Sequence, residues 1–230
     1  MFRLAFAVLV IATGFAASVS AQSRIDRYEE ARIPTARGLS DEERSRLATY
    51  DYAKCVWKAK EWRVDEALAT YWHPEKDEKT IMRLVESRCL SSGELTMSQG
   101  LFRGAFYLLA AHKRMADDDF DFAPYAVPDW QALMDSAEHA NPASLPLLLF
   151  GSCVLRQGTS AVRDFVNSEV ASSEEKAAIG EIAPSLSGCI PAGAEVKFSR
   201  SALKALLAEN LYRETLMARA GALPAAVPGN

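Results

Sequence analysis

The sequence predicts an all-α protein made of two related helical modules, each stapled by one disulfide. Three observations support this. Apolar residues recur at the three- and four-residue spacing of helices, and no stretch keeps the alternation typical of a strand. The four cysteines form two pairs with nearly equal separations, 34 and 36 positions. The residues that follow the second cysteine of each pair also run in step, which indicates a tandem duplication.

Composition narrows the class of protein. The chain has 230 residues, of which 49% are hydrophobic and 24% charged, and this is ordinary globular composition. Lysine and arginine total 26 against 30 acidic residues, for a formal net charge of -4. Because binding to phosphates requires a cationic surface, this balance argues against nucleic acid as a partner.

Residues 1–21 have the pattern of a signal peptide. The apolar run Leu4–Ala17 is shorter than the roughly 20 residues of a membrane span, and small residues precede a cleavage site after Ala21. An uncleaved anchor helix is the alternative. No later segment is expected to span a membrane, because the best candidate, Leu145–Leu155, is short and holds a proline and a glycine. We expect a soluble mature chain in a bacterial periplasm or outside the cell.

Export bears on how the cysteines are interpreted. An even number of cysteines in an oxidising compartment favours disulfides, and four cysteines allow three connectivities. The duplication favours Cys55 with Cys89 and Cys153 with Cys189. A four-thiolate metal site is the alternative, but no C-x-x-C pair supports it, so no metal is expected.

The first half predicts four helices. The first begins at Ser40, which forms a capping box with Glu43, and extends to about Lys60. The others are expected at Val64–Tyr71, at Asp77–Leu90, and from a cap at Ser98 to about Met115.

The second half predicts the same order of helices. Their expected ranges are about Ala143–Arg156, Thr159–Val170, Ser172–Leu186 and Ser199–Ala220. The predicted organisation is then a loose N-terminal segment at 22–39, a first module at 40–116, a connector with a short helix near Asp129–His139 at 117–142, a second module at 143–220, and a flexible tail at 221–230.

The duplication is clearest after the second cysteine of each half. A Cys-x-x-x-Gly turn, 89–93 or 189–193, leads to an apolar residue followed by serine, Met97-Ser98 or Phe198-Ser199. With a one-residue insertion, Leu101–Ala105 then falls in step with Ala202–Leu206.

The turn Cys189–Gly193 and the run Ser201–Arg213, rich in Leu, Lys, Ala, Glu and Tyr, carry a resemblance. This part resembles uncharacterised secreted helical proteins of Gram-negative bacteria, which carry signal peptides. The similarity covers residues 145–215 and, more faintly, 50–110. It implies an exported helical protein and no particular activity or cofactor.

Aromatic and basic residues alternate near the first cysteine. Such side chains can stack on sugar rings or lie at a surface, so the candidate binding residues are Trp57, Lys58, Trp62, Arg63 and Trp72. The alternative is that Trp57 and Trp62 fill the core while the cations remain in water.

The three histidines, His73, His112 and His139, are too dispersed to form a zinc site. Asp135 or Glu138 would have to orient a catalytic base at His139 or His112. The more ordinary interpretation of these histidines is a polar residue near the end of a helix.

The S-x-x-K motif of penicillin-binding enzymes occurs twice, at Ser173–Lys176 and Ser201–Lys204. Neither copy has the companion motifs of those enzymes, and both serines are placed where helices begin. The acidic run Asp117–Asp121 lacks the spacing and the glycine of a calcium loop, so a solvated linker is expected there.

The sequence therefore predicts a non-catalytic binding or interaction module of the bacterial cell envelope that needs no cofactor. Its partner would be an envelope protein, cell-wall glycan or a small ligand in a groove. An envelope hydrolase with an unrecognised active site is the alternative.

Overall fold

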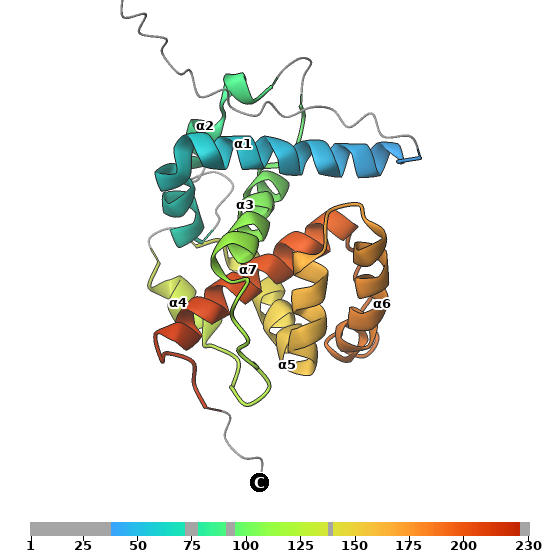
Figure 1. The fold of residues 1–230 in the computed structure, drawn as a ribbon. Helices are drawn as coiled ribbons and strands as arrows, with labels where there is room; N and C mark the ends of the chain where they lie inside the picture. Colours follow the sequence, from blue (N-terminus) through green and yellow to red (C-terminus); the bar gives the residue numbers. More distant parts are fainter. Residues whose placement is uncertain (1–37, 72–77, 91–94, 138–139, 226–230) are drawn as a thin grey trace, which may run out of the picture.

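The computed structural model describes residues 38–71, 78–90, 95–137 and 140–225, and this part of the chain is helical without strands. The all-α prediction is confirmed (Figure 1). The elements are α1 (Asp41–Ala69), α2 (Glu78–Leu84), η1 (Ser87–Cys89), α3 (Gln99–Arg114), α4 (Trp130–Asp135), η2 (Pro142–Ser144), α5 (Leu145–Asn167), α6 (Ser173–Gly188) and α7 (Arg200–Arg219).

Serine side chains cap α1, α3, α6 and α7, whereas the hydroxyl of Ser144 before α5 makes no cap bond. The Ser40 hydroxyl accepts from the Glu43 amide, and the Glu43 carboxylate accepts from the Ser40 amide at 2.8 Å. The hydroxyls of Ser98, Ser172 and Ser199 each accept from an amide three residues further on and so cap α3, α6 and α7, without the reciprocal carboxylate bond. These caps satisfy amides that the first helical turn leaves unpaired.

Two pairs of predicted helices are each one kinked helix. Lys60 is non-helical inside α1, and Gly158 is non-helical inside α5. Each kink lies five residues after a cysteine, Cys55 or Cys153. This correspondence accords with the duplication, which stays a prediction.

The disulfides have the predicted connectivity. Cys55 is bonded to Cys89 and Cys153 to Cys189, with Cα–Cα distances of 5.7 and 5.8 Å. Each bond ties the first helix of a half to the segment that precedes α3 or α7. Because all four sulfurs are paired, the alternative of a four-thiolate metal site is wrong.

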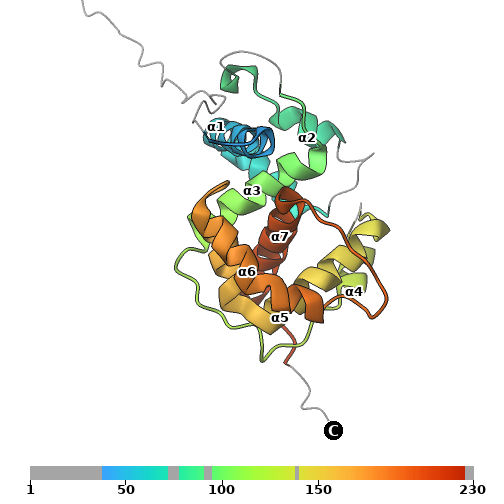
Figure 2. The ribbon, with the colours of Figure 1, turned by 90° about the vertical axis from the view of Figure 1, so that its right-hand side faces the viewer.

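Helices α3 and α7 cross at the centre of the molecule, with α1 and α2 on one side and α5 and α6 on the other (Figures 1 and 2). The larger of two hydrophobic clusters in the described residues includes residues from both predicted modules, among them Trp57, Phe106, Leu155 and Leu207. The module boundaries stay a prediction, but the two ranges do not have separate cores.

The third predicted helix, Asp77–Leu90, is shorter than expected. Its described part consists of α2 and the 3₁₀ turn η1. The Lys60 ammonium donates to the carbonyls of Arg83 and Val85 at 3.0 and 2.7 Å, and the Glu86 amide donates to the Tyr52 hydroxyl at 2.9 Å. These long-range bonds replace helical ones between α2 and η1.

The acidic run is exposed at Asp117, Asp119 and Asp121, as a solvated linker predicts, but the part of the connector that follows the run is packed against the protein. Phe122 and Trp130 are fully buried, and the Phe122 amide donates to the Thr159 hydroxyl at 3.1 Å. Asp118 pairs with Arg219 of α7. Phe122 and Trp130, which both follow the run, hold the connector against apolar clusters of the interior, and the short helix α4 lies within the predicted range.

The predicted flexible tail is described only at residues 221–225, and this part is ordered against the core. Leu223 is only 9% exposed, and the Ala126 amide donates to the Pro224 carbonyl at 2.8 Å. Burial of the leucine explains the difference from the prediction. Of the predicted loose segment 22–39, residues 22–37 lie outside the described residues.

One described stretch, Pro142–Asn167, is long and apolar enough to span a membrane, with a hydropathy of 1.2. Its helix α5 packs against α6 and α7, and Val154, Leu155 and Val162 are fully buried. A core helix passes the same test of length and composition, so the stretch is weak evidence for a span.

Candidate functional site

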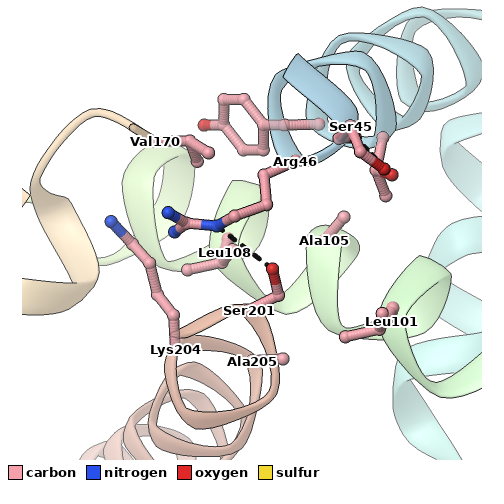
Figure 3. Close-up of a pocket in the computed structure, with 11 residues that line it drawn as sticks. Ser45, Arg46, Leu101, Ala105, Leu108, Val170, Ser201, Lys204 and Ala205 are labelled. Carbon is pink, nitrogen blue, oxygen red and sulfur yellow. Dashed lines mark hydrogen bonds between the residues drawn. The ribbon is translucent and has the colours of Figure 1, made fainter. Parts of the chain in front are cut away.

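A small pocket opens where α1, α3 and α7 converge (Figure 3). Its volume is about 70 Å³. Its lining includes the aliphatic side chains of Leu101, Leu108 and Val170 as well as hydroxyl groups. Two cationic side chains, Arg46 of α1 and Lys204 of α7, complete the lining.

Arg46 and Lys204 share one carboxylate. Glu175 of α6 accepts from Arg46 Nη2 at 2.7 Å and from Lys204 Nζ at 2.9 Å, and all three side chains are buried. The Lys204 ammonium also donates to the carbonyl and the hydroxyl of Ser168. The second carboxylate oxygen of Glu175 accepts from the Ala171 amide at 3.1 Å. Both oxygens of this carboxylate are therefore occupied.

The trio is asymmetric in charge. Burial alone would raise the pKa of Glu175, but hydrogen bonds from Lys204 and Arg46 lower it, so the group stays ionised. Burial lowers the pKa of Lys204, although Glu175 partly opposes this shift. Within the trio two cations face one anion, which leaves an excess of one positive charge among these three groups.

The guanidinium of Arg46 is only partly hydrogen-bonded. Its Nε donates to the Ser201 hydroxyl at 3.1 Å, as Figure 3 shows, and Nη2 binds Glu175. The remaining nitrogen, Nη1, is buried and has no partner in the described part of the chain. A buried donor left unpaired costs free energy.

Tyr50, which also lines the pocket, is hydrogen-bonded to His112. The Val166 carbonyl can only accept, so His112 Nε2 donates to it at 2.9 Å and Nδ1 accepts from the Tyr50 hydroxyl at 2.8 Å. Burial lowers the pKa of His112 and raises that of Tyr50 to about 12. The imidazole thus joins α1, α3 and α5 as a neutral group, with both nitrogens engaged. The other predicted base, His139, and its orienter Glu138 lie outside the described residues, as does His73.

The S-x-x-K motifs contribute to structure rather than to a nucleophile and its base. The Ser201 hydroxyl bonds to Arg46, while Lys204 binds Glu175 and Ser168. In the other copy, Ser173 is the first residue of α6 and Lys176 is exposed. The prediction that both serines belong to helix starts is confirmed.

The predicted aromatic and basic residues do not form one site. Trp57 is 1% exposed and lies in the core, where its indole donates to Glu61, as the alternative interpretation expects. Trp62, against that alternative, is 64% exposed, and the Arg63 guanidinium lies 4.4 Å from its ring centroid. Lys58 is exposed, and Trp72 lies outside the described residues.

A second buried polar cluster joins α1, α3 and α7. Arg103 and Arg213 both donate to the Tyr107 hydroxyl at 2.7 Å and to the Thr70 carbonyl. Arg213 also pairs with Glu209 at 2.9 Å. These contacts hold the C-terminal end of α1 against the α3–α7 crossing.

A third cluster fixes the connector to α5 and α7. Ser152 accepts from the Trp130 indole at 2.7 Å and donates to Glu214 at 2.5 Å. Arg156 pairs with Glu214 at 2.7 Å and donates to the carbonyls of Tyr125 and Ala126. Burial raises the pKa of Glu214. The groups of this cluster bond to one another and to the connector, and so hold the connector against α5 and α7.

Among the described residues, no group of three or more His, Cys, Asp or Glu side chains is placed to bind a metal ion. Asp118 of the acidic run pairs with Arg219, and Asp121 accepts from the Ala123 amide.

No protein-family model, curated protein or solved structure matches this chain. The site must therefore be interpreted from its own geometry.

Proposed function

We propose that this protein is an exported, non-catalytic binding module of the bacterial cell envelope, and that the pocket between α1, α3 and α7 is its binding site. The single observation that supports the binding function is that a donor group at this pocket lacks a hydrogen-bond partner. Arg46 has a buried donor without a partner among the described residues, and Arg46 and Lys204 share the single carboxylate of Glu175.

Export is supported by the two disulfides together with the signal-peptide pattern of residues 1–21. Disulfides form and persist in oxidising compartments and are rare in the reducing cytosol. We assign the mature chain to the periplasm or the extracellular space, with cleavage after Ala21.

A binding function fits the groups around the pocket better than a hydrolytic one. The imidazole of His112 has both nitrogens hydrogen-bonded and is held neutral behind Tyr50. The Ser201 hydroxyl and the Lys204 ammonium are each engaged with other groups. A nucleophile paired with a free base, which hydrolysis by side chains requires, is not formed by these residues.

Export is tested by peptide mapping of the secreted protein without reduction, with the N-terminus read in the same experiment. We expect a chain beginning at Gln22 with Cys55 joined to Cys89 and Cys153 to Cys189. A chain that retains residues 1–21, or free thiols in the exported protein, would contradict the assignment.

Binding is tested by two-dimensional NMR of the mature chain against a library of small polar and charged molecules. We expect ligands to move the amide signals of Thr49, Leu108 and Ser201, which line the pocket. Signals near Trp62, which is exposed on α1 and does not line the pocket, serve as an internal comparison. Ligands that move only the Trp62 region would place the binding site elsewhere.

A further inference from the structure

The charged groups at the pocket favour one class of ligand. Its positive charge comes from Arg46 and Lys204, and the one carboxylate between them, Glu175, is not part of the lining. A cationic ligand would meet an excess of like charge, whereas an anionic ligand would neutralise it.

The donors at the pocket also favour an anion. Arg46 Nη1 lacks an acceptor among the described residues. The Ser201 hydroxyl accepts from Arg46 Nε, which leaves its own hydrogen free to donate. Ser201 is the second residue of α7, so the positive end of the helix dipole adds to the attraction for negative charge. The Tyr50 hydroxyl is not a free donor, because it donates to His112.

The size of the pocket and its aliphatic lining limit the ligand further. The pocket volume of about 70 Å³ is small and favours a ligand with few non-hydrogen atoms. Leu101, Leu108 and Val170 offer a surface for a short hydrocarbon chain. A chain of three to five carbons that ends in a carboxylate contains five to seven such atoms.

We infer that the pocket binds a short aliphatic carboxylate, whose oxygens accept from Arg46 and Ser201 while its hydrocarbon chain lies against Leu101, Leu108 and Val170. The inference rests on the proposed binding function of the same pocket. The ligand closes an incomplete arrangement, because it supplies the acceptor that Arg46 lacks and the negative charge that Glu175 alone does not provide.

The probes are propionate, butyrate and valerate, compared with their primary amides and with the corresponding primary amines. Binding to the mature chain is followed by NMR of the pocket amides and by calorimetry. We expect the carboxylates to bind and to move the signals of Thr49, Leu108 and Ser201, with the amides at least tenfold weaker and the amines without effect.

The variant Arg46→Met removes the unpartnered donor and leaves Glu175 and Lys204 as a balanced pair. We expect it to weaken butyrate binding at least tenfold. The matched control is Arg44→Met, the same substitution two positions earlier in α1, where the arginine is more exposed. Ser201→Ala, a smaller change, is expected to weaken binding several-fold, and it guards against the case in which Arg46→Met fails to fold.

The outcomes separate the inference from the function on which it rests. Carboxylate binding that depends on Arg46 and Ser201 supports both. Amides or amines that bind in the pocket more tightly than carboxylates would overturn the inference and leave the binding function intact. Pocket signals that no probe and no library molecule moves would overturn both.

Discussion

Gly104 of α3 and Ala205 of α7 meet so closely at the helix crossing that a β-carbon added to Gly104 would lie 2.3 Å from the β-carbon of Ala205. These two residues are also in step in the predicted duplication. The crossing on which the core is built therefore brings together two positions that correspond in the two halves. Small side chains at both positions let the helix backbones approach.

This contact predicts that Gly104→Ala destabilises the protein. A methyl group at this position must push the helices apart, and overpacking of this kind costs typically 1–3 kcal/mol, more than the roughly 1 kcal/mol that alanine gains over glycine in a helix. We expect a net loss of up to about 2 kcal/mol in the free energy of unfolding. Urea unfolding followed by circular dichroism measures it.

Gly100→Ala, in the first turn of the same helix, is the control. A β-carbon at Gly100 would meet nothing within 4 Å, so this variant should be unchanged or slightly more stable. The double variant Gly104→Ala with Ala205→Gly should recover stability relative to Gly104→Ala alone, because it exchanges the two side chains across the crossing. Equal behaviour of Gly100→Ala and Gly104→Ala would contradict the close approach.

Glu175→Gln is predicted to be strongly destabilising. The substitution leaves Arg46 and Lys204, both buried, facing each other without the anion that they share. Breaking a buried ion pair by removing one partner costs about 3–5 kcal/mol. Chemical denaturation should show a lower midpoint for the variant with an unchanged slope.

The control for this change is Glu181→Gln, the same substitution at an exposed position of α6. It should alter the free energy of unfolding by less than about 0.5 kcal/mol. If Glu175→Gln changed the free energy of unfolding as little as this control, Glu175 would not form buried ion pairs with Arg46 and Lys204.

The two disulfides are predicted to differ in resistance to reductant. Cys55 and Cys89 are buried, at 4% and 0% exposure, whereas Cys153 and Cys189 are half-buried. Since exchange needs access to a sulfur, a mild reductant should open Cys153–Cys189 first. Alkylation at successive times, read by mass spectrometry, reports the order.

In denaturing urea the difference in access disappears, and both bonds should then be reduced at similar rates. The two loops are nearly equal, at 34 and 36 residues, so each bond contributes about 3–4 kcal/mol in the chain-entropy model. Earlier alkylation of Cys55 and Cys89 in the folded protein would show that burial does not govern the order.

The starts of several helices could be predicted because they depend on residues that are close together in the sequence. Ser40, Ser98 and Ser199 cap helices through contacts three residues away, so the sequence around each cap is sufficient to place it. The end of α2 could not be placed in this way. It depends on Lys60, which bonds to carbonyls 23 and 25 residues further along the chain.

The candidate site was missed for the same physical reason. Arg46 and Glu175 are 129 residues apart, and each lies on a helix where a charged residue is ordinarily taken to face water. Only the packing of α1, α6 and α7 brings them together in the interior. Lys204 was singled out as part of an S-x-x-K motif, yet no pattern linked it to Glu175. By contrast, the pairing of the cysteines was predictable from their nearly equal separations of 34 and 36 positions together with the predicted duplication.

The last prediction concerns pH. His112 has a lowered pKa because burial disfavours its charged form, so the unfolded chain, with a pKa near 6.5, binds a proton more readily than the folded chain. Stability from this residue is therefore complete above about pH 6.5 and is lost as the pH falls from there toward the lower folded-state pKa. The variant His112→Gln keeps an acceptor for the Tyr50 hydroxyl and a donor for the Val166 carbonyl without titrating.

We expect the free energy of unfolding of the native protein to fall more steeply than that of His112→Gln between pH 7.5 and 5.5. The carboxylates with lowered pKa, such as Glu175 and Glu86, lose their contribution only below about pH 4.5. They and the other two histidines are common to both proteins, so the difference in slope isolates His112. Parallel profiles over this range would show that the imidazole is protonated as easily in the folded protein as in the unfolded chain, and that it does not join α1, α3 and α5 as a neutral group.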